Sequence, residues 1–296
     1  MQSTPVISCS ALTKDYGAEQ GLFDCNLQIN QGEVFGLIGP NGAGKSTLIK
    51  LLMDLVRPTS GSATIFNLDS RRNSTELKRD IGYLPGELMQ FPGVTAGYIL
   101  NLLLNMRGIH DRKFLIELAE RLQLDLTRKF QDLSHGNKQK VGIVQAFMHK
   151  PKLLILDEPT LGLDPLIQRE LRNLIEEVSK AGTTVVLSSH VLSEVESFCS
   201  RIGLINRGRI VKVGTLPELR SSRVHMISIL FEGATPAKSE LESAGAQSIN
   251  GSGQLVNIEI RGSIDQVLKV ISKYQVLEMD SRELSLEEVF FSEVAN

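Results

Sequence analysis

The stretch "GPNGAGKST", Gly39 to Thr47, decides the fold. It fits the P-loop pattern, in which a glycine is followed after four residues by Gly-Lys-Ser. Glycines let the backbone approach an anion closely, so successive N–H groups point at phosphate oxygens. In such a loop Lys45 contacts the β and γ phosphates, and Ser46 offers its hydroxyl to Mg²⁺. The sequence therefore predicts a nucleotide site formed by Gly39, Pro40, Asn41, Gly42, Ala43, Gly44, Lys45, Ser46 and Thr47.

The flanking sequence has the strand and helix that this loop requires. "VFGLI" (34–38) reads as a buried strand and "KSTLIKLLMDL" (45–55) as a helix. "LLILD" (153–157) and "TTVVLSSH" (183–190) are continuous apolar runs, as expected of parallel strands covered on both faces. Residues 165–182 show helical spacing and end at a glycine, which indicates a crossover helix. Alternating strands and helices predict an α/β fold with a parallel sheet.

Two further regions differ from this pattern. Residues 88–150 have helical spacing and are predicted to form a helical insertion in a sheet domain that spans 1–219. Residues 220–296 alternate in the order β-α-β-β-α-β, typical of a small split βαβ (ferredoxin-like) α+β domain, with turn signals at "NGSG" (250–253). We expect that domain to have an accessory or regulatory role.

Composition limits the class of protein. Of 296 residues, 42% are hydrophobic and 22% are charged, which favours a globular fold over disorder. A formal net charge of -2 gives no reason to expect a nucleic acid partner. Three widely spaced cysteines fit neither a disulfide framework nor a zinc site, which favours a reducing compartment. No stretch approaches the length of about 18 apolar residues that a membrane span needs.

Phosphoryl transfer also needs a carboxylate for the metal and a group that activates water. Asp157 and Glu158 follow a predicted buried strand, which delivers them to the carboxyl edge of the sheet. We expect Asp157 to bind the metal and Glu158 to face the attacking water.

With these motifs the sequence resembles the nucleotide-binding subunits of ATP-binding cassette (ABC) transporters, over about the first 220 residues. "LSHGNKQKV" (133–141) resembles the family's signature motif, with His135 and Asn137 where glycine and glutamine are usual. The resemblance implies that Ser134 and Gly136 bind the γ phosphate of ATP held by a second cassette chain. Two ATP molecules would then be enclosed by a dimer.

The resemblance implies further roles. Tyr16 in "LTKDYG" matches the aromatic residue that stacks on adenine. Asp164 in "LGLDP" matches the aspartate loop that couples the two sites, and His190 matches the switch histidine near the γ phosphate. The family's glutamine after "GYLP" is missing, because Gly86 and Glu87 stand there. We expect Glu87 to replace it near the metal.

The implied function is that of an ATPase with ATP and Mg²⁺ as cofactors, driving a separate polytopic membrane permease. It would lie in the cytoplasm, held at the inner face of the membrane by that permease. "SLEEVF" (285–290) and the extra domain resemble cassettes of two-component exporters. A soluble ABC ATPase or a regulatory clamp that is not coupled to transport is the alternative. A GTPase is disfavoured because "NKQK" (137–140) lacks the aspartate of a guanine-reading motif.

Overall fold

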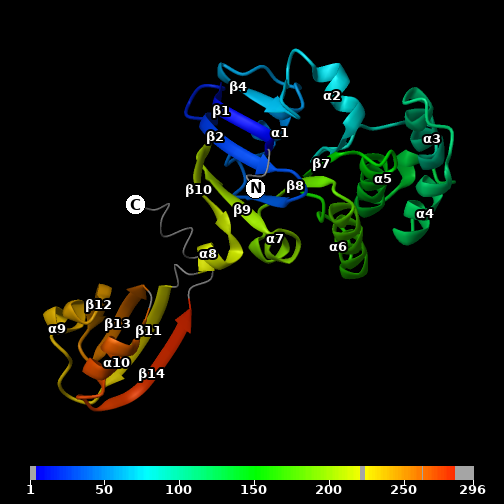
Figure 1. Cartoon of the computed structure of the whole chain (residues 1–296). Coiled ribbons are helices and arrows are strands. Elements are labelled where there is room, and N and C mark those ends of the chain that lie inside the picture. Colours follow the sequence, from blue (N-terminus) through cyan, green and yellow to red (C-terminus); the bar gives the residue numbers. More distant parts are fainter. Residues whose placement is uncertain (1–4, 221–223, 262, 284–296) are drawn as a thin grey trace. The chain divides into compact units, whose positions relative to one another are not determined.

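A computed structural model describes residues 5–220, 224–261 and 263–283. The chain divides into two compact units, Met1–Gly214 and Thr215–Asn296, each with its own sheet and core (Figure 1). The segment "SLEEVF" (285–290) lies outside the described residues. In the described part of the chain, no helix is long and apolar enough to cross a membrane.

The first unit contains a six-stranded sheet. Its strands follow one another across the sheet in the order β10 (Arg209–Thr215), β9 (Arg201–Asn206), β3 (Val34–Ile38), β8 (Thr184–Ser189), β7 (Leu153–Asp157) and β6 (Ile81–Leu84). The neighbours from β9 to β6 pair in parallel. Every residue of β3, β7 and β8 is buried, because both faces of these strands are covered. This confirms the α/β class and the three strands predicted from continuous apolar runs.

A second, four-stranded antiparallel sheet lies in the same unit and was not predicted from the sequence. Its order is β2 (Gly21–Asn30), β1 (Pro5–Asp15), β4 (Ser60–Ile65) and β5 (Leu68–Asp69). In β2 the buried Leu22, Cys25, Leu27 and Ile29 come from one face of the strand. These side chains share one apolar core with helix α1 (Lys45–Leu52) and the parallel sheet.

The remaining helices of this unit fall into two groups. Helix α2 (Ser74–Asp80) connects β5 of the antiparallel sheet to β6 of the six-stranded sheet. Helices α6 (Pro165–Lys180) and α7 (Leu192–Phe198) connect strands within the six-stranded sheet. A helical group between β6 and β7 consists of α3 (Ala96–Met106), α4 (Lys113–Arg121), the 3₁₀ turn η1 (Phe130–Asp132) and α5 (His135–Phe147) (Figure 1). Arg121 of α4 joins this group to α6, because its guanidinium binds Glu170 at 2.5 Å and Glu177 at 2.7 Å.

The second unit begins with α8 (Leu216–Arg220) and continues as a split βαβ arrangement. Its elements are β11 (Val224–Phe231), α9 (Lys238–Ser243), β12 (Ala246–Ser252), β13 (Leu255–Arg261), α10 (Asp265–Ile271) and β14 (Val276–Glu283). The strand order is β12-β13-β11-β14, and all pairs are antiparallel. Ile229, Phe231 and Ile258 of the sheet share an apolar core with Val267 of α10.

Candidate nucleotide site

The P-loop connects β3 to α1 and packs closely against the backbone of β9 and of the turn that follows it. A side chain on Gly39 would place its Cβ 2.2 Å from the carbonyl oxygen of Ile205 in β9, so no residue but glycine fits. Gly44 precedes α1 with a φ of 109°, a conformation that other residues rarely adopt. The loop is further fixed by the N–H of Gly208, which donates to the carbonyl of Ala43 at 2.9 Å. These contacts hold the start of α1 at the carboxyl end of the parallel strands.

Lys45 is buried within the site and makes three polar contacts. Its ammonium donates to the carbonyl oxygens of Gly39 at 2.6 Å and Pro40 at 3.2 Å. It also lies 3.4 Å from Glu158 Oε1, and the lysine is only 6% exposed. A buried ammonium needs such partners, because an unpaired buried charge is costly.

Asp157 is the last residue of β7 and Glu158 follows it, and the two side chains make different contacts. Asp157 is 2% exposed, and its Oδ1 accepts a hydrogen bond from Ser188 Oγ at 2.5 Å. Its Oδ2 faces Gly86, where an added Cβ would lie 3.1 Å away. Glu158 has a φ of 49°, in the left-handed region. Its N–H donates to Ser188 O at 3.2 Å and its carbonyl accepts from Gln139 Nε2 at 3.0 Å.

The Glu158 carboxylate connects the P-loop to the end of β8. While Oε1 faces Lys45, Oε2 accepts a hydrogen bond from His190 Nδ1 at 2.9 Å. His190 is 41% exposed and Glu158 is 17% exposed. A carboxylate that is oriented by a histidine and lies beside the P-loop lysine can accept a proton from a nucleophilic water.

One cavity of about 300 Å³ brings most of the predicted residues together. It is lined by residues 41–47 of the P-loop, Gly86, Glu87, Asp157 and Glu158. An adjoining cavity of about 600 Å³ shares Ser46, Gly86, Glu87 and Asp157 with it. The site therefore has carboxylate and hydroxyl oxygens, a lysine and backbone amides around a volume that is open to a ligand.

Tyr16 follows β1 outside that cavity. Its side chain is 53% exposed, and Lys14 Nζ lies 5.2 Å from the centre of its ring. An exposed aromatic ring is available to stack on a planar ligand.

Ser134, Gly136 and Asp164 also lie outside the cavity. Ser134 and Asp164 are the N-caps of two helices. Ser134 caps α5, with its Oγ accepting from the N–H of Asn137 at 3.3 Å and from Asn137 Nδ2 at 3.1 Å. Asp164 caps α6 by accepting from the N–H of Leu166 at 3.1 Å and of Ile167 at 3.0 Å. A Cβ on Gly136 would lie 2.4 Å from Gly162 O, so the two loops touch within one chain.

Sequence reasoning missed Glu194 of α7. Its Oε2 accepts hydrogen bonds from both Thr160 Oγ1 and Ser189 Oγ, each at 2.7 Å. Ser189 Oγ in turn accepts from the N–H of Val191 at 3.0 Å. Glu194 thus holds the loop after Glu158 next to the loop that carries His190. No spacing rule connects these three residues along the chain, so no signal in the sequence could have found this contact.

Comparisons with known proteins give the family. The family model for ABC transporters matches residues 22–161. The bacitracin transport ATP-binding protein of Bacillus licheniformis is 38% identical over 214 residues, which make up 70% of this chain and 69% of that protein. The linearmycin resistance ATP-binding protein of Bacillus subtilis (strain 168) is 35% identical over 221 residues, or 73% of this chain and 71% of that protein.

Solved structures that resemble this chain come from the same family. The ATP-binding subunit of an ABC transporter superposes with a TM-score of 0.68 and 32% identity, covering 73% of this chain and 92% of that one. A dimeric ATP-binding cassette in a post-hydrolysis state with ADP and Pi superposes with a TM-score of 0.63 and 27% identity, covering 71% and 98%. The resemblance inferred from the sequence and the P-loop fold of the first unit are confirmed. The chain belongs to the ABC transporter family, as one of its ATP-hydrolysing ATP-binding proteins.

Proposed function

We propose that this chain is the ATPase subunit of an ABC exporter, which pairs with a second cassette chain and drives a separate membrane permease from the cytoplasmic face. The relatives named for bacitracin transport and linearmycin resistance support export as the direction. The observation that carries the proposal is the convergence of Lys45, Glu158 and His190 beside the P-loop cavity.

Each residue has a role in this proposal. The P-loop amides and Lys45 bind the β and γ phosphates of ATP. Glu158 accepts the proton of the attacking water, and His190 orients that carboxylate through the 2.9 Å hydrogen bond and contacts the γ phosphate. Tyr16 stacks on adenine, since its ring is 53% exposed.

Ser46, Asp157 and Glu87 are proposed to hold Mg²⁺. Mg²⁺ takes one or two carboxylates together with water and phosphate oxygens, and the donors here are all oxygen atoms. The fit is supported by Asp157, since Ser188 binds its Oδ1 and the residue that faces its Oδ2, Gly86, has no side chain. When bound, Mg²⁺ would neutralise charge on the β and γ phosphates.

Ser134, Gly136 and Asp164 are proposed to act on the ATP of the second chain. They lie outside the cavity that is lined by the P-loop of their own chain. Ser134 and Asp164 stand at helix N-termini, where backbone N–H groups favour an anion. The dimeric cassette among the similar structures supports this arrangement.

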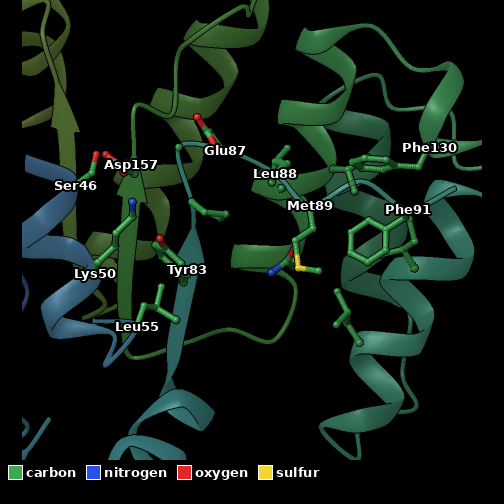
Figure 2. Close-up of a pocket in the computed structure, with 17 residues that line it drawn as sticks. Ser46, Lys50, Leu55, Tyr83, Glu87, Leu88, Met89, Phe91, Phe130 and Asp157 are labelled. Carbon is green, nitrogen blue, oxygen red and sulfur yellow. The ribbon is translucent and has the colours of Figure 1, made fainter. Parts of the chain in front are cut away.

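The cavity of about 600 Å³ is the proposed docking site of the permease. Ser46, Lys50, Tyr83 and Asp157 lie at one side of it, and Phe91 and Phe130 at the other, with Met89 between them (Figure 2). Burial and the charge of Asp157 raise the pKa of Tyr83 to about 12, so its hydroxyl remains a hydrogen-bond donor at neutral pH. A short helix with an apolar face and a polar end would match this lining.

The substitution Glu158→Gln tests the proposal. It keeps the size of the side chain and removes its basicity, so ATP should still bind while hydrolysis falls by at least about a hundredfold. Dimers should then accumulate with Mg-ATP in size-exclusion chromatography. Glu76→Gln on α2 is the matched control and should turn over at the wild-type rate. Unchanged hydrolysis in the Glu158 variant would remove Glu158 as the base.

A further inference from the structure

A third cavity, of about 260 Å³, lies in the first unit away from the P-loop. Three chain segments line it: the turn after α1, strand β4, and the turn that leads from β5 toward α2 (Figure 1). Its side-chain lining comprises Arg57, Ser62, Asp69, Ser70, Arg71 and Arg72. It shares no residue with the two cavities of the candidate ATPase site.

The charge of this cavity is strongly positive. Arg57, Arg71 and Arg72 contribute three guanidinium groups, and Asp69 contributes one carboxylate. Arg57 lies 3.4 Å from Asp54, but the guanidinium groups of Arg71 and Arg72 form no ion pair with an acidic side chain of the described residues. Two unpaired guanidinium groups beside a concave surface form a strong attraction for an anion.

Asp69 shapes the turn that carries these arginines. Its Oδ1 accepts from the N–H of Arg71 at 3.0 Å and of Arg72 at 2.8 Å. The hydrogen bond from Arg72 N–H, together with that from Arg71, lowers the pKa of Asp69, so it is ionised at neutral pH. The carboxylate thus holds the turn, and the charges of Arg72 and Arg71 also lower its pKa, although neither guanidinium group forms an ion pair with it.

Ser70 adds a hydroxyl to the lining of the cavity. It is only 3% exposed, yet it lines the cavity, and its Oγ makes no hydrogen bond within the described residues. Its backbone N–H donates to Ala63 O at 3.0 Å, so the hydroxyl is the polar group of this residue that remains available to a ligand. The hydroxyl is not among the fully buried polar atoms, so it is open to the cavity and available to a ligand there.

From the unpaired arginines and the unpartnered Ser70 hydroxyl, we propose that this cavity binds a phosphate-type anion. A tetrahedral phosphate offers several oxygens in different directions, which suits guanidinium groups and hydroxyls that come from three segments. The phosphate belongs either to a small soluble compound or to an anionic lipid headgroup. The proposal does not depend on the ATPase mechanism, because the two sites have no residue in common.

The test compares the full-length chain with the double variant Arg71→Gln/Arg72→Gln. The matched control is Arg112→Gln/Lys113→Gln, which removes two exposed charges at the start of α4. Saturating ADP is added throughout so that the P-loop is occupied. One arm titrates inorganic phosphate by calorimetry, and the other sediments phosphatidylcholine vesicles with and without phosphatidic acid.

We expect one of the two probes to bind the wild type and the control variant equally. Its affinity should fall by about tenfold or more in the arginine double variant, since two charge-assisted contacts are lost. Ser70→Ala should weaken the same probe without altering the net charge. Phosphate binding alone identifies a soluble ligand, and vesicle binding alone identifies a headgroup. The proposal is overturned if neither probe binds, or if the arginine and control variants lose affinity equally.

Discussion

Lys45 Nζ lies 3.4 Å from Glu158 Oε1 while it donates to Gly39 O at 2.6 Å. The ammonium that we propose binds phosphate is therefore already paired with the proposed catalytic base and with its own loop. In the proposed mechanism an ATP phosphate shares this ammonium with Glu158, which would bring the reacting group next to the proposed base.

Replacing Lys45 should weaken nucleotide binding itself. Lys45→Ala removes a charge-assisted hydrogen bond worth about 1.5–3 kcal/mol, so affinity for ATP should fall by about tenfold to a hundredfold. Fluorescent-nucleotide titration measures it. Lys50→Ala, an exposed lysine in the same helix, should bind ATP as the wild type does. Equal affinities of the Lys45 variant and the wild type would contradict the role given to Lys45.

Glu194 should act on turnover through the two loops that it joins. Glu194→Ala frees Thr160 and Ser189, which are both 2.7 Å from its Oε2, so the geometry beside Glu158 and His190 loosens. We expect kcat to fall by about tenfold with little change in KM, because positioning errors act mainly on the reacting geometry.

Two comparisons separate this positioning role from general destabilisation. Glu194→Gln keeps an acceptor oxygen and should recover part of the lost kcat. Ser193→Ala, an exposed neighbour, should behave as the wild type. A parallel loss of kcat in the alanine and glutamine variants would argue against the hydrogen-bond account.

The proposal that two chains share each site predicts complementation. A Ser134→Arg chain retains its P-loop, and a Lys45→Ala chain retains its signature helix. Mixing the two inactive chains should restore activity, because one of the two sites in a mixed dimer combines intact halves. ATP hydrolysis as a function of mixing ratio measures this. Activity that stays at background at every ratio would contradict the shared site.

The docking cavity gives a prediction about the permease. Met89 is 74% exposed and lines that cavity, so Met89→Asp should reduce copurification with the permease by at least about tenfold through burial of an unpaired charge. Ile116→Asp is the matched control, because Ile116 is 47% exposed and lies outside the cavity. If both variants copurify like the wild type, the permease docks elsewhere.

We expect the half-buried His149 to lower the free energy of unfolding in acid. Burial, followed by the charge of Arg107, lowers its pKa to about 4 from the usual 6.5, and its Nδ1 has no hydrogen-bond partner among residues 5–220, 224–261 and 263–283. The unfolded chain therefore takes up a proton at higher pH than the folded chain does. Stability from this group is present above pH 6.5 and is lost as the pH falls toward 4.

The measurement is the free energy of unfolding in urea between pH 7 and pH 4.5. Partial exposure screens the effect, so we expect His149 to account for roughly 1–2 kcal/mol of the loss. His149→Gln should show a correspondingly flatter dependence on pH. The same slope in both proteins would show that His149 is not its source.

Local chemistry allowed much of this protein to be predicted from its sequence. The P-loop, the carboxylates after a buried strand and the split βαβ order depend on residue type and short spacing, which are visible in one chain. The antiparallel sheet was missed, although Cys25, Leu27 and Ile29 in β2 carry an alternating signal that a closer search could have found.

The sequence by itself determined the P-loop, the strands beside it and the order of elements in the second unit, because each of these follows from neighbouring residues. Only the tertiary structure decided that Glu158 joins Lys45 to His190, that Glu194 holds two loops, and that Arg57 lines one cavity with Arg71 and Arg72. The physical reason is that these contacts join segments far apart in the chain. Their geometry is set by how the sheets and helices pack, which local residue patterns do not encode.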